Sequence, residues 1–188
     1  VVYKVSGFPK EKVIGSGTVL DTARLRFLIG EYLQVASKNV HAYIMGEHGD
    51  SSFVPWEHAY VGCKKLTDVM KEQGKDLKDL DKIYEDVQQA AYEIINKKKA
   101  TYYGIGIALT RLIKAILGDE NAIMPVSMYQ NGEYGHSGMF IGVPAIINRN
   151  GIKEMVKLNL EPKVQEKFDY SCNLLSKMIE EEIRRVEK

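Results

Sequence analysis

The spacing of hydrophobic residues along the chain first predicts a helix near the N-terminus. Apolar residues that recur every three or four positions place this helix over residues 18–35. These apolar residues are Leu25, Leu28, Ile29 and Leu33. Thr18 followed by Asp21 has the spacing of a capping box at the start of the helix.

Three more helices follow from the same kind of pattern. Residues 79–98 are amphipathic, with the apolar positions of one face repeating at helical period. Residues 105–117 form a more apolar helix, and we expect Gly118 to end it in a left-handed conformation. The chain from Pro162 to residue 188 is predicted to be helical, because proline is well accommodated in the first turn.

Short apolar runs bounded by turn residues predict strands or extended segments. These are residues 40–45, 53–62, 122–129 and 139–147. Pro55 interrupts the second, the glycine-rich turn 131–138 joins the last two, and residues 148–151 close the last. Helices and antiparallel strands in this order, without repeating βαβ units, predict an α+β fold.

Composition and charge narrow the class of protein. The chain has 188 residues, of which 45% are hydrophobic, enough to bury a core. With 26 basic and 25 acidic residues there is no overall field to attract nucleic acid or a membrane surface, and no apolar run approaches the roughly 20 residues of a membrane span. Cys63 and Cys172 form no CxxC motif, so a reducing, cytoplasmic location is expected.

The residues with candidate chemistry lie in two short segments. Asp21 and Arg24, three apart on the first helix, share a face, whereas Arg26 lies about 200° from Arg24. His48 follows a strand in a glycine-bounded loop, where it could donate a proton near neutral pH with Asp21 fixing its tautomer. The planar fork of Arg24 suits a substrate carboxylate. The pattern indicates an acid/base site.

Plainer alternatives exist for the same residues. Asp21 could be only a capping residue, or could form an ordinary surface salt bridge with Arg24. His48 could bind a metal with Glu47 and Asp50, but no second histidine stands at HExxH spacing, so we predict no metal site.

Glycine-rich phosphate-binding motifs are incomplete. The Gly-Ser-Gly of residues 15–17 has leucine at the third glycine position, as does the Gly-Ile-Gly of residues 104–106, and no Walker A motif occurs. We therefore expect no Rossmann domain in this chain. A nucleotide cofactor would need its phosphates bound by another domain.

The chain resembles the C-terminal, catalytic domain of bacterial-type NAD-dependent L-lactate dehydrogenases, in the lactate/malate dehydrogenase family. The matching stretches are residues 13–26, 39–51, 100–106 and 141–151. The resemblance implies that residues 1–188 form one such domain and that the N-terminal dinucleotide-binding domain is absent from it. It also implies a homotetramer, as in full-length members of the family.

The resemblance also implies a reaction and site residues. The reaction is hydride transfer between NAD and a 2-hydroxy or 2-keto acid, with (S)-lactate and pyruvate as the expected pair. His48 would be the proton donor, Asp21 its orienting partner and Arg24 the anchor of the substrate carboxylate. Thr101 matches the pocket threonine of the family, and Ile105 matches the residue that packs on the nicotinamide ring. From their pattern alone, Thr101 and Ile105 would be ordinary packing residues at a helix start.

A second candidate site involves Arg26 and His41. If the strand keeps its period, His41 and His48 point to opposite sides, as Arg24 and Arg26 do on the helix. In the bacterial lactate dehydrogenases that the chain resembles, the pair that matches Arg26 and His41 lines a subunit interface and binds fructose 1,6-bisphosphate. The alternative is a structural pair at an interface, without a ligand.

The function classes that remain are the catalytic half of a lactate dehydrogenase, inactive without its nucleotide-binding half, and a non-catalytic oligomerisation or effector-binding module. Half of a malate dehydrogenase is a third possibility, because the residue that separates lactate from malate is expected in the other half. We also expect the apolar face of the helix over residues 79–95 to be covered by the nucleotide domain or by other subunits.

Overall fold

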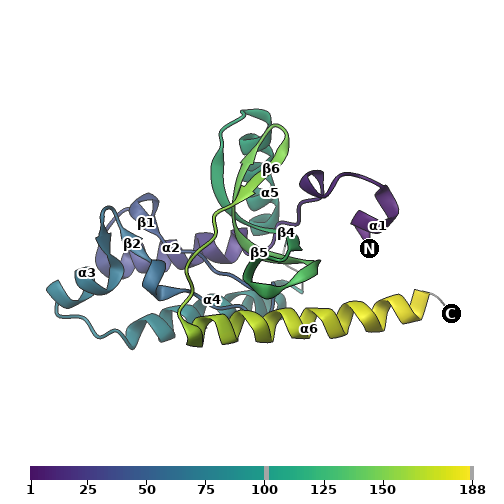
Figure 1. Ribbon diagram of the computed structural model, residues 1–188. Coiled ribbons are helices and arrows are strands. Elements are labelled where there is room, and N and C mark those ends of the chain that lie inside the picture. The colour runs from purple at the N-terminus through teal and green to yellow at the C-terminus, as the bar shows by residue number, and fades with distance from the viewer. Residues whose placement is uncertain (100–101, 187–188) are drawn as a thin grey trace.

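Two antiparallel sheets and six α-helices make up the described part of the chain, residues 1–99 and 102–186 of a computed structural model (Figure 1). The larger sheet has the strand order β4-β5-β6, which are Ala122–Asn131, Ser137–Asn148 and Gly151–Met155. The smaller sheet has the order β1-β2-β3, which are Val40–His41, Tyr60–Val61 and Lys64–Lys65. The predicted α+β fold is confirmed.

The helices pack around both sheets. In chain order they are α1 (Val2–Ser6), α2 (Val19–Leu33), α3 (Leu66–Glu72), α4 (Asp79–Lys98), α5 (Tyr103–Leu117) and α6 (Pro162–Val186). In Figure 1, α6 runs as one long helix along the bottom of the view, and α1 lies apart near the N-terminus. The bounds of α2, α4 and α5 lie within two residues of those predicted. The end of α6 predicted at residue 188 lies outside the described residues.

The long hairpin of β4 and β5 is the centre of the larger sheet. Its strands pair from Ala122 and Ile147 to Tyr129 and Phe140, with a register shift before the turn. The hairpin predicted over residues 122–129 and 139–147 is confirmed. The third strand, β6, was not predicted, because its exposed Lys153 and Glu154 weaken the hydrophobic signal.

The fold has two hydrophobic clusters. The first, which we call the sheet cluster, packs β4 to β6 against α5 and α6 and includes Leu112, Ala115, Ile141, Val143, Phe168 and Cys172. The second, which we call the helix cluster, joins α2, α3 and α4 over the small sheet and includes Leu25, Ile29, Leu66, Met70, Leu80, Ile83 and Val87.

The expectation that another domain or subunit covers the apolar face of α4 is wrong for the first half of that face. Leu80, Ile83 and Val87 are buried inside this chain, in the helix cluster. The side chains of Ala91 and Ile95, further along the same face, lie outside the described residues. The outer face of α5 is the exposed apolar face, with Ile107 71% and Leu117 75% exposed.

Two predicted helix caps are also wrong. The hydroxyl of Thr18 makes no cap bond to α2 but donates to the carbonyl oxygen of Ile44 at 2.6 Å. Gly118 stays right-handed (φ −79°), and Asp119 takes the left-handed conformation instead (φ 54°). Aspartate tolerates that conformation, and its carboxylate accepts the N–H of Arg149 across the turn.

The strand predicted over residues 40–45 ends at His41. Further along, the N–H of Ile44 donates to the hydroxyl of Thr22 at 3.0 Å, and its carbonyl accepts from Thr18. Because Thr18, just before α2, and Thr22 of α2 bind these backbone groups with their side chains, the segment leaves the small sheet and follows the helix. The extended stretch predicted over residues 53–62 contains a 3-10 turn, Trp56–His58, before β2.

Candidate functional site

The loop that carries His48 is fixed at both ends. Met45 and Phe53 pair in an isolated bridge, and Gly46 pairs with Gly142 of β5. Gly46 has φ +98°, a conformation that favours glycine. The loop between these pairings is therefore short, and His48 lies at its exposed tip.

His48 and Arg24 meet at the carboxylate of Asp21. Since a carboxylate only accepts hydrogen bonds, Nδ1–H of His48 is the donor to Oδ2 of Asp21, at 2.8 Å. Nη1 of Arg24 lies 3.3 Å from Oδ1 of the same carboxylate. The structure therefore brings together the three residues that the sequence grouped.

Exposure differs sharply among these three side chains. The His48 side chain is 61% exposed, whereas Asp21 is 17% and Arg24 is 20% exposed. The imidazole is thus presented to the outside, and its orienting carboxylate lies beneath it. With Nδ1 committed to Asp21, Nε2 is the ring nitrogen left to exchange a proton with a ligand.

The surroundings raise the pKa of His48 above its ordinary value of 6.5. The largest cause is the hydrogen bond to Asp21, which stabilises the imidazolium. Partial burial and the positive charge of Arg24 lower the pKa, and the charges of Asp21 and Glu47 raise it further. The arrangement stabilises the protonated imidazole, which is the form that donates a proton.

A cavity of about 230 Å³ opens beside His48. Its lining residues are Asp21, Ile44, His48, Gly49, Asp50, Ser52, Tyr84, Val87, Gln88 and Tyr92. Sequence reasoning missed the contribution of α4. Tyr84, Gln88 and Tyr92 are four residues apart along the helix, and that one polar-aromatic face is the signal that could have found them.

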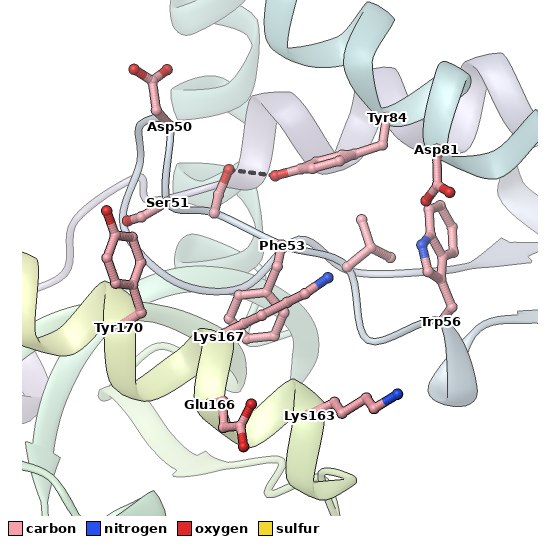
Figure 2. Close-up of a pocket in the computed structure, with 12 residues that line it drawn as sticks. Asp50, Ser51, Phe53, Trp56, Asp81, Tyr84, Lys163, Glu166, Lys167 and Tyr170 are labelled. Atoms are coloured by element: carbon pink, nitrogen blue, oxygen red, sulfur yellow. Dashed lines mark hydrogen bonds between the residues drawn. The ribbon is translucent and has the colours of Figure 1, made fainter. Parts of the chain in front are cut away.

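A larger cavity of about 580 Å³ lies next to the first and shares Asp50, Ser52 and Tyr84 with it. Figure 2 shows the loop from Asp50 to Phe53 above, α4 with Tyr84 to one side, and Lys163, Glu166, Lys167 and Tyr170 of α6 below. The hydroxyls of Ser52 and Tyr84 are 2.7 Å apart. Burial raises the pKa of Tyr84 to about 12, so this hydroxyl keeps its proton.

The start of α5 reaches the first turn of α2. A Cβ added at Gly104 would lie 3.2 Å from the side chain of Leu20, the neighbour of Asp21. Ile105, the next residue, keeps 37% of its surface exposed. Thr101 lies outside the described residues.

Arg26 is separated from Arg24 and from Asp21. Its Nε–H donates to the carbonyl oxygen of Ala42 at 2.9 Å, and its guanidinium lies over the ring of Tyr43, 4.4 Å from the centroid. Nη2 of Arg26 is buried without a hydrogen-bond partner. His41, one residue before Ala42, is exposed on β1.

No group of three metal-ligating side chains occurs among residues 1–99 and 102–186. No helix in this described part of the chain has the length and apolar character needed to cross a membrane.

Comparison with protein families finds one match that covers most of the chain. The family model described as lactate/malate dehydrogenase, alpha/beta C-terminal domain, matches residues 18–186. Among curated relatives, L-lactate dehydrogenase 1 of Peribacillus psychrosaccharolyticus is 49% identical over 178 residues, 94% of this chain and 56% of that protein. L-lactate dehydrogenase of Geobacillus stearothermophilus is 50% identical over the same shares of the two chains.

Solved structures are similar in fold and sequence. A lactate dehydrogenase enzyme, MGS-M5, from a Medee basin deep-sea metagenome library has a TM-score of 0.91 and 50% identity, over 93% of this chain and 56% of that one. The minor L-lactate dehydrogenase of Enterococcus mundtii in its ligands-bound form has a TM-score of 0.91 and 44% identity, over 95% of this chain and 57% of that one. The chain thus spans a little over half the length of these relatives.

Proposed function

Since this chain belongs to the lactate/malate dehydrogenase family, as an alpha/beta C-terminal domain, we propose that it supplies the catalytic residues of an NAD-dependent L-lactate dehydrogenase that interconverts (S)-lactate and pyruvate. The observation that carries the proposal is the Asp21 carboxylate, which holds His48 on one oxygen and Arg24 on the other. Reduction of a keto acid needs a proton donor and a carboxylate anchor side by side. The named relatives, all lactate dehydrogenases, favour lactate over malate.

His48 moves the proton in this proposal. In the direction of reduction, the imidazolium donates from Nε2 to the keto oxygen, while Nδ1–H stays on Asp21 and keeps the ring in place. In the direction of oxidation, neutral His48 accepts the proton of the hydroxyl at the same nitrogen. Asp21 stabilises the imidazolium form in both directions, and the raised pKa of His48 supports this role.

Arg24 binds the substrate. Its contact with Asp21 uses Nη1, and a guanidinium has five N–H donors, so it can hold a carboxylate in two parallel hydrogen bonds. Thr101 completes the substrate pocket in this proposal, from the family resemblance.

The proposed cofactor is NAD, which when bound supplies the hydride acceptor or donor. An exposed apolar Ile105, beside the turn of α2 that carries Asp21, suits the face of a nicotinamide ring. Since the glycine motifs of residues 15–17 and 104–106 are incomplete, we propose that a dinucleotide-binding domain holds most of the cofactor. We place the complete enzyme in the cytoplasm.

Two measurements test this proposal. The chain alone is expected neither to enhance NADH fluorescence in a saturable way nor to reduce pyruvate. In the complete protein, His48→Ala is expected to lower turnover at least about a thousandfold with an unchanged circular dichroism spectrum. His58→Ala is the matched control, because the His58 ring contacts the carbonyl oxygen of Asn159 away from the site. Retained turnover in His48→Ala would remove the histidine from the reaction.

A second proposed function is effector binding by Arg26 and His41. The buried, unpartnered Nη2 of Arg26 supports an anion site, and fructose 1,6-bisphosphate is the proposed ligand, bound between subunits of a homotetramer. The bisphosphate is expected to raise the melting temperature of the complete protein and to promote tetramers, and Arg26→Gln to abolish both effects. Inorganic phosphate is the control ligand.

The absence of any response to the bisphosphate would favour a structural pair without a ligand. A response in a complete protein that lacks turnover would favour the alternative function, a non-catalytic oligomerisation or effector-binding module.

A further inference from the structure

Ser171, a serine of α6, lies directly beneath the loop that carries His48. We propose that Ser171 is a positioning residue, whose hydroxyl holds this loop at the distance at which His48 meets Asp21. The proposal rests on the proposed function, in which His48 transfers the proton, and it adds a group from the far end of the chain to that site.

The hydroxyl of Ser171 connects two residues that flank His48. Its oxygen accepts the backbone N–H of Glu47 at 2.7 Å and lies 3.0 Å from the hydroxyl of Ser51. The Ser51 hydroxyl donates to the carboxylate of Glu47. Because the Ser51 proton is used there, Ser171 is the donor to Ser51, and the bonds close a ring around the base of the loop.

Ser171 is well suited to hold the loop because it lies within the packed core. It is fully buried, and its helix neighbours Phe168 and Cys172 are fully buried in the sheet cluster. A Cβ added at Gly46 would lie 2.8 Å from the Ser171 oxygen. The backbone that leads to His48 therefore rests on a hydroxyl fixed in the core.

The imidazole is thus held from two sides. Asp21 of α2 binds its Nδ1, and Ser171 of α6 fixes the backbone on which the ring is mounted. Replacing Ser171 by alanine leaves the Glu47 N–H without its partner, so the loop relaxes and the contact between His48 and Asp21 lengthens. Arg24 is carried by α2 and stays in place, so substrate binding is preserved.

The charged and titratable groups around His48 remain after this substitution. Asp21 and Arg24 face it from α2, Tyr84 and Tyr92 from α4, and Glu47 and Asp50 from its own loop. A change in the titration of His48 would therefore report a change in its position.

The test compares Ser171→Ala with Ser176→Ala in the complete protein. Ser176 is a half-buried serine of the same helix and serves as the matched control. For Ser171→Ala we expect kcat for keto acid reduction to fall about tenfold, with KM for the keto acid within about twofold. We also expect the pH above which reduction is lost to move down by about half a unit, since a weaker bond to Asp21 lowers the pKa of His48.

A nuclear magnetic resonance titration of the His48 ring in the same proteins separates this proposal from the proposed function, because it needs no turnover. A lowered pKa of His48 in Ser171→Ala, and an unchanged one in Ser176→Ala, would support the positioning role even in a protein without activity. An unchanged titration of His48 would overturn it, whether or not kcat falls. If Ser171→Ala does not fold, Ser171→Cys, which keeps the side chain but accepts hydrogen bonds only weakly, is judged by the same two outcomes.

Discussion

Each carboxylate oxygen of Asp21 contacts a different side chain, and these two contacts bring His48 and Arg24 together. Oδ2 orients the ring of His48, and Oδ1 holds Arg24. The spacing of Asp21 and Arg24 on a helix predicted their shared face, and the glycines around His48 predicted its exposed loop. The distance between helix and loop was set by tertiary contacts, through the hydrogen bonds of Thr18 and Thr22 to Ile44.

A first prediction concerns Asp21→Asn. The amide has nearly the same size as the carboxylate but carries no charge, so we expect the pKa of His48 to fall by about one unit. In the proposed reaction, reduction of pyruvate needs the imidazolium, so its high-pH limit in the complete protein should move down with that pKa. Histidine ring titration by nuclear magnetic resonance, with the pH profile of kcat, checks this. An unmoved pH limit would show that Asp21 does not set the protonation of His48.

The same pair links stability to pH. The folded-state pKa of His48 is raised above 6.5, so pairing with Asp21 contributes stability that is fully present below about pH 6.5. That contribution is lost as the pH rises through the raised pKa. Asp21→Asn should therefore destabilise the chain more at acidic than at alkaline pH.

At the scale of elements, long periodic segments were predicted well and short ones were not. The helices α2, α4 and α5 each carry at least four turns of pattern, and the hairpin of β4 and β5 is long and apolar. The short helix α3 and the edge strand β6 were missed, because few residues carry their pattern and much of each is exposed. The positions of α3 and β6 in the fold depend on the elements that they pack against, which the local sequence does not show.

A second prediction tests what holds β6. Gly151 begins this strand with φ +98°, and a Cβ there would lie 2.1 Å from the carbonyl oxygen of Glu11, in the 3-10 turn Lys10–Lys12. Gly151→Ala is expected to lower the free energy of unfolding by about 3 kcal/mol, from a strained backbone plus overlap with Glu11.

Gly132→Ala is the matched control for this prediction. Gly132 has φ +110° but open space around it, so only the backbone strain applies, about 1 kcal/mol. Urea unfolding of the chain measures both variants. Equal losses of stability would contradict a close contact between β6 and the 3-10 turn.

At the scale of the whole molecule, α5 differs from α4 because it has apolar residues on two faces. Leu80, Ile83 and Val87 of α4 are buried in the helix cluster, and Ala108, Leu112 and Ala115 of α5 are buried in the sheet cluster. The opposite face of α5 keeps Tyr103, Ile107, Ile113 and Leu117 exposed. No local rule tells which of the two apolar faces of α5 the chain itself will cover. The arrangement of the two hydrophobic clusters decides it.

A third prediction follows from this exposed face. The isolated chain is expected to self-associate reversibly as its concentration rises, because apolar surface on α5 is removed from water in the contact. Ile107→Glu should weaken the association at least about tenfold, since it places a charge in that contact. Sedimentation velocity measures it.

Val5→Glu is the control for this third prediction, because Val5 is 81% exposed on α1, away from α5. An equal effect of both variants would show that association does not use the outer face of α5.

The sequence by itself determined the family, the α+β class and the long helices, and it grouped His48, Asp21 and Arg24 as a candidate site, because these depend on local periodicity and on distinctive residue types at short spacing. Tertiary structure alone decided where Thr18 directs its hydroxyl, which helix face is buried, and that Ser171, more than 120 residues from His48, lies beneath its loop. Such contacts join residues far apart in the chain. They are set by the packing of whole elements, which no local pattern specifies.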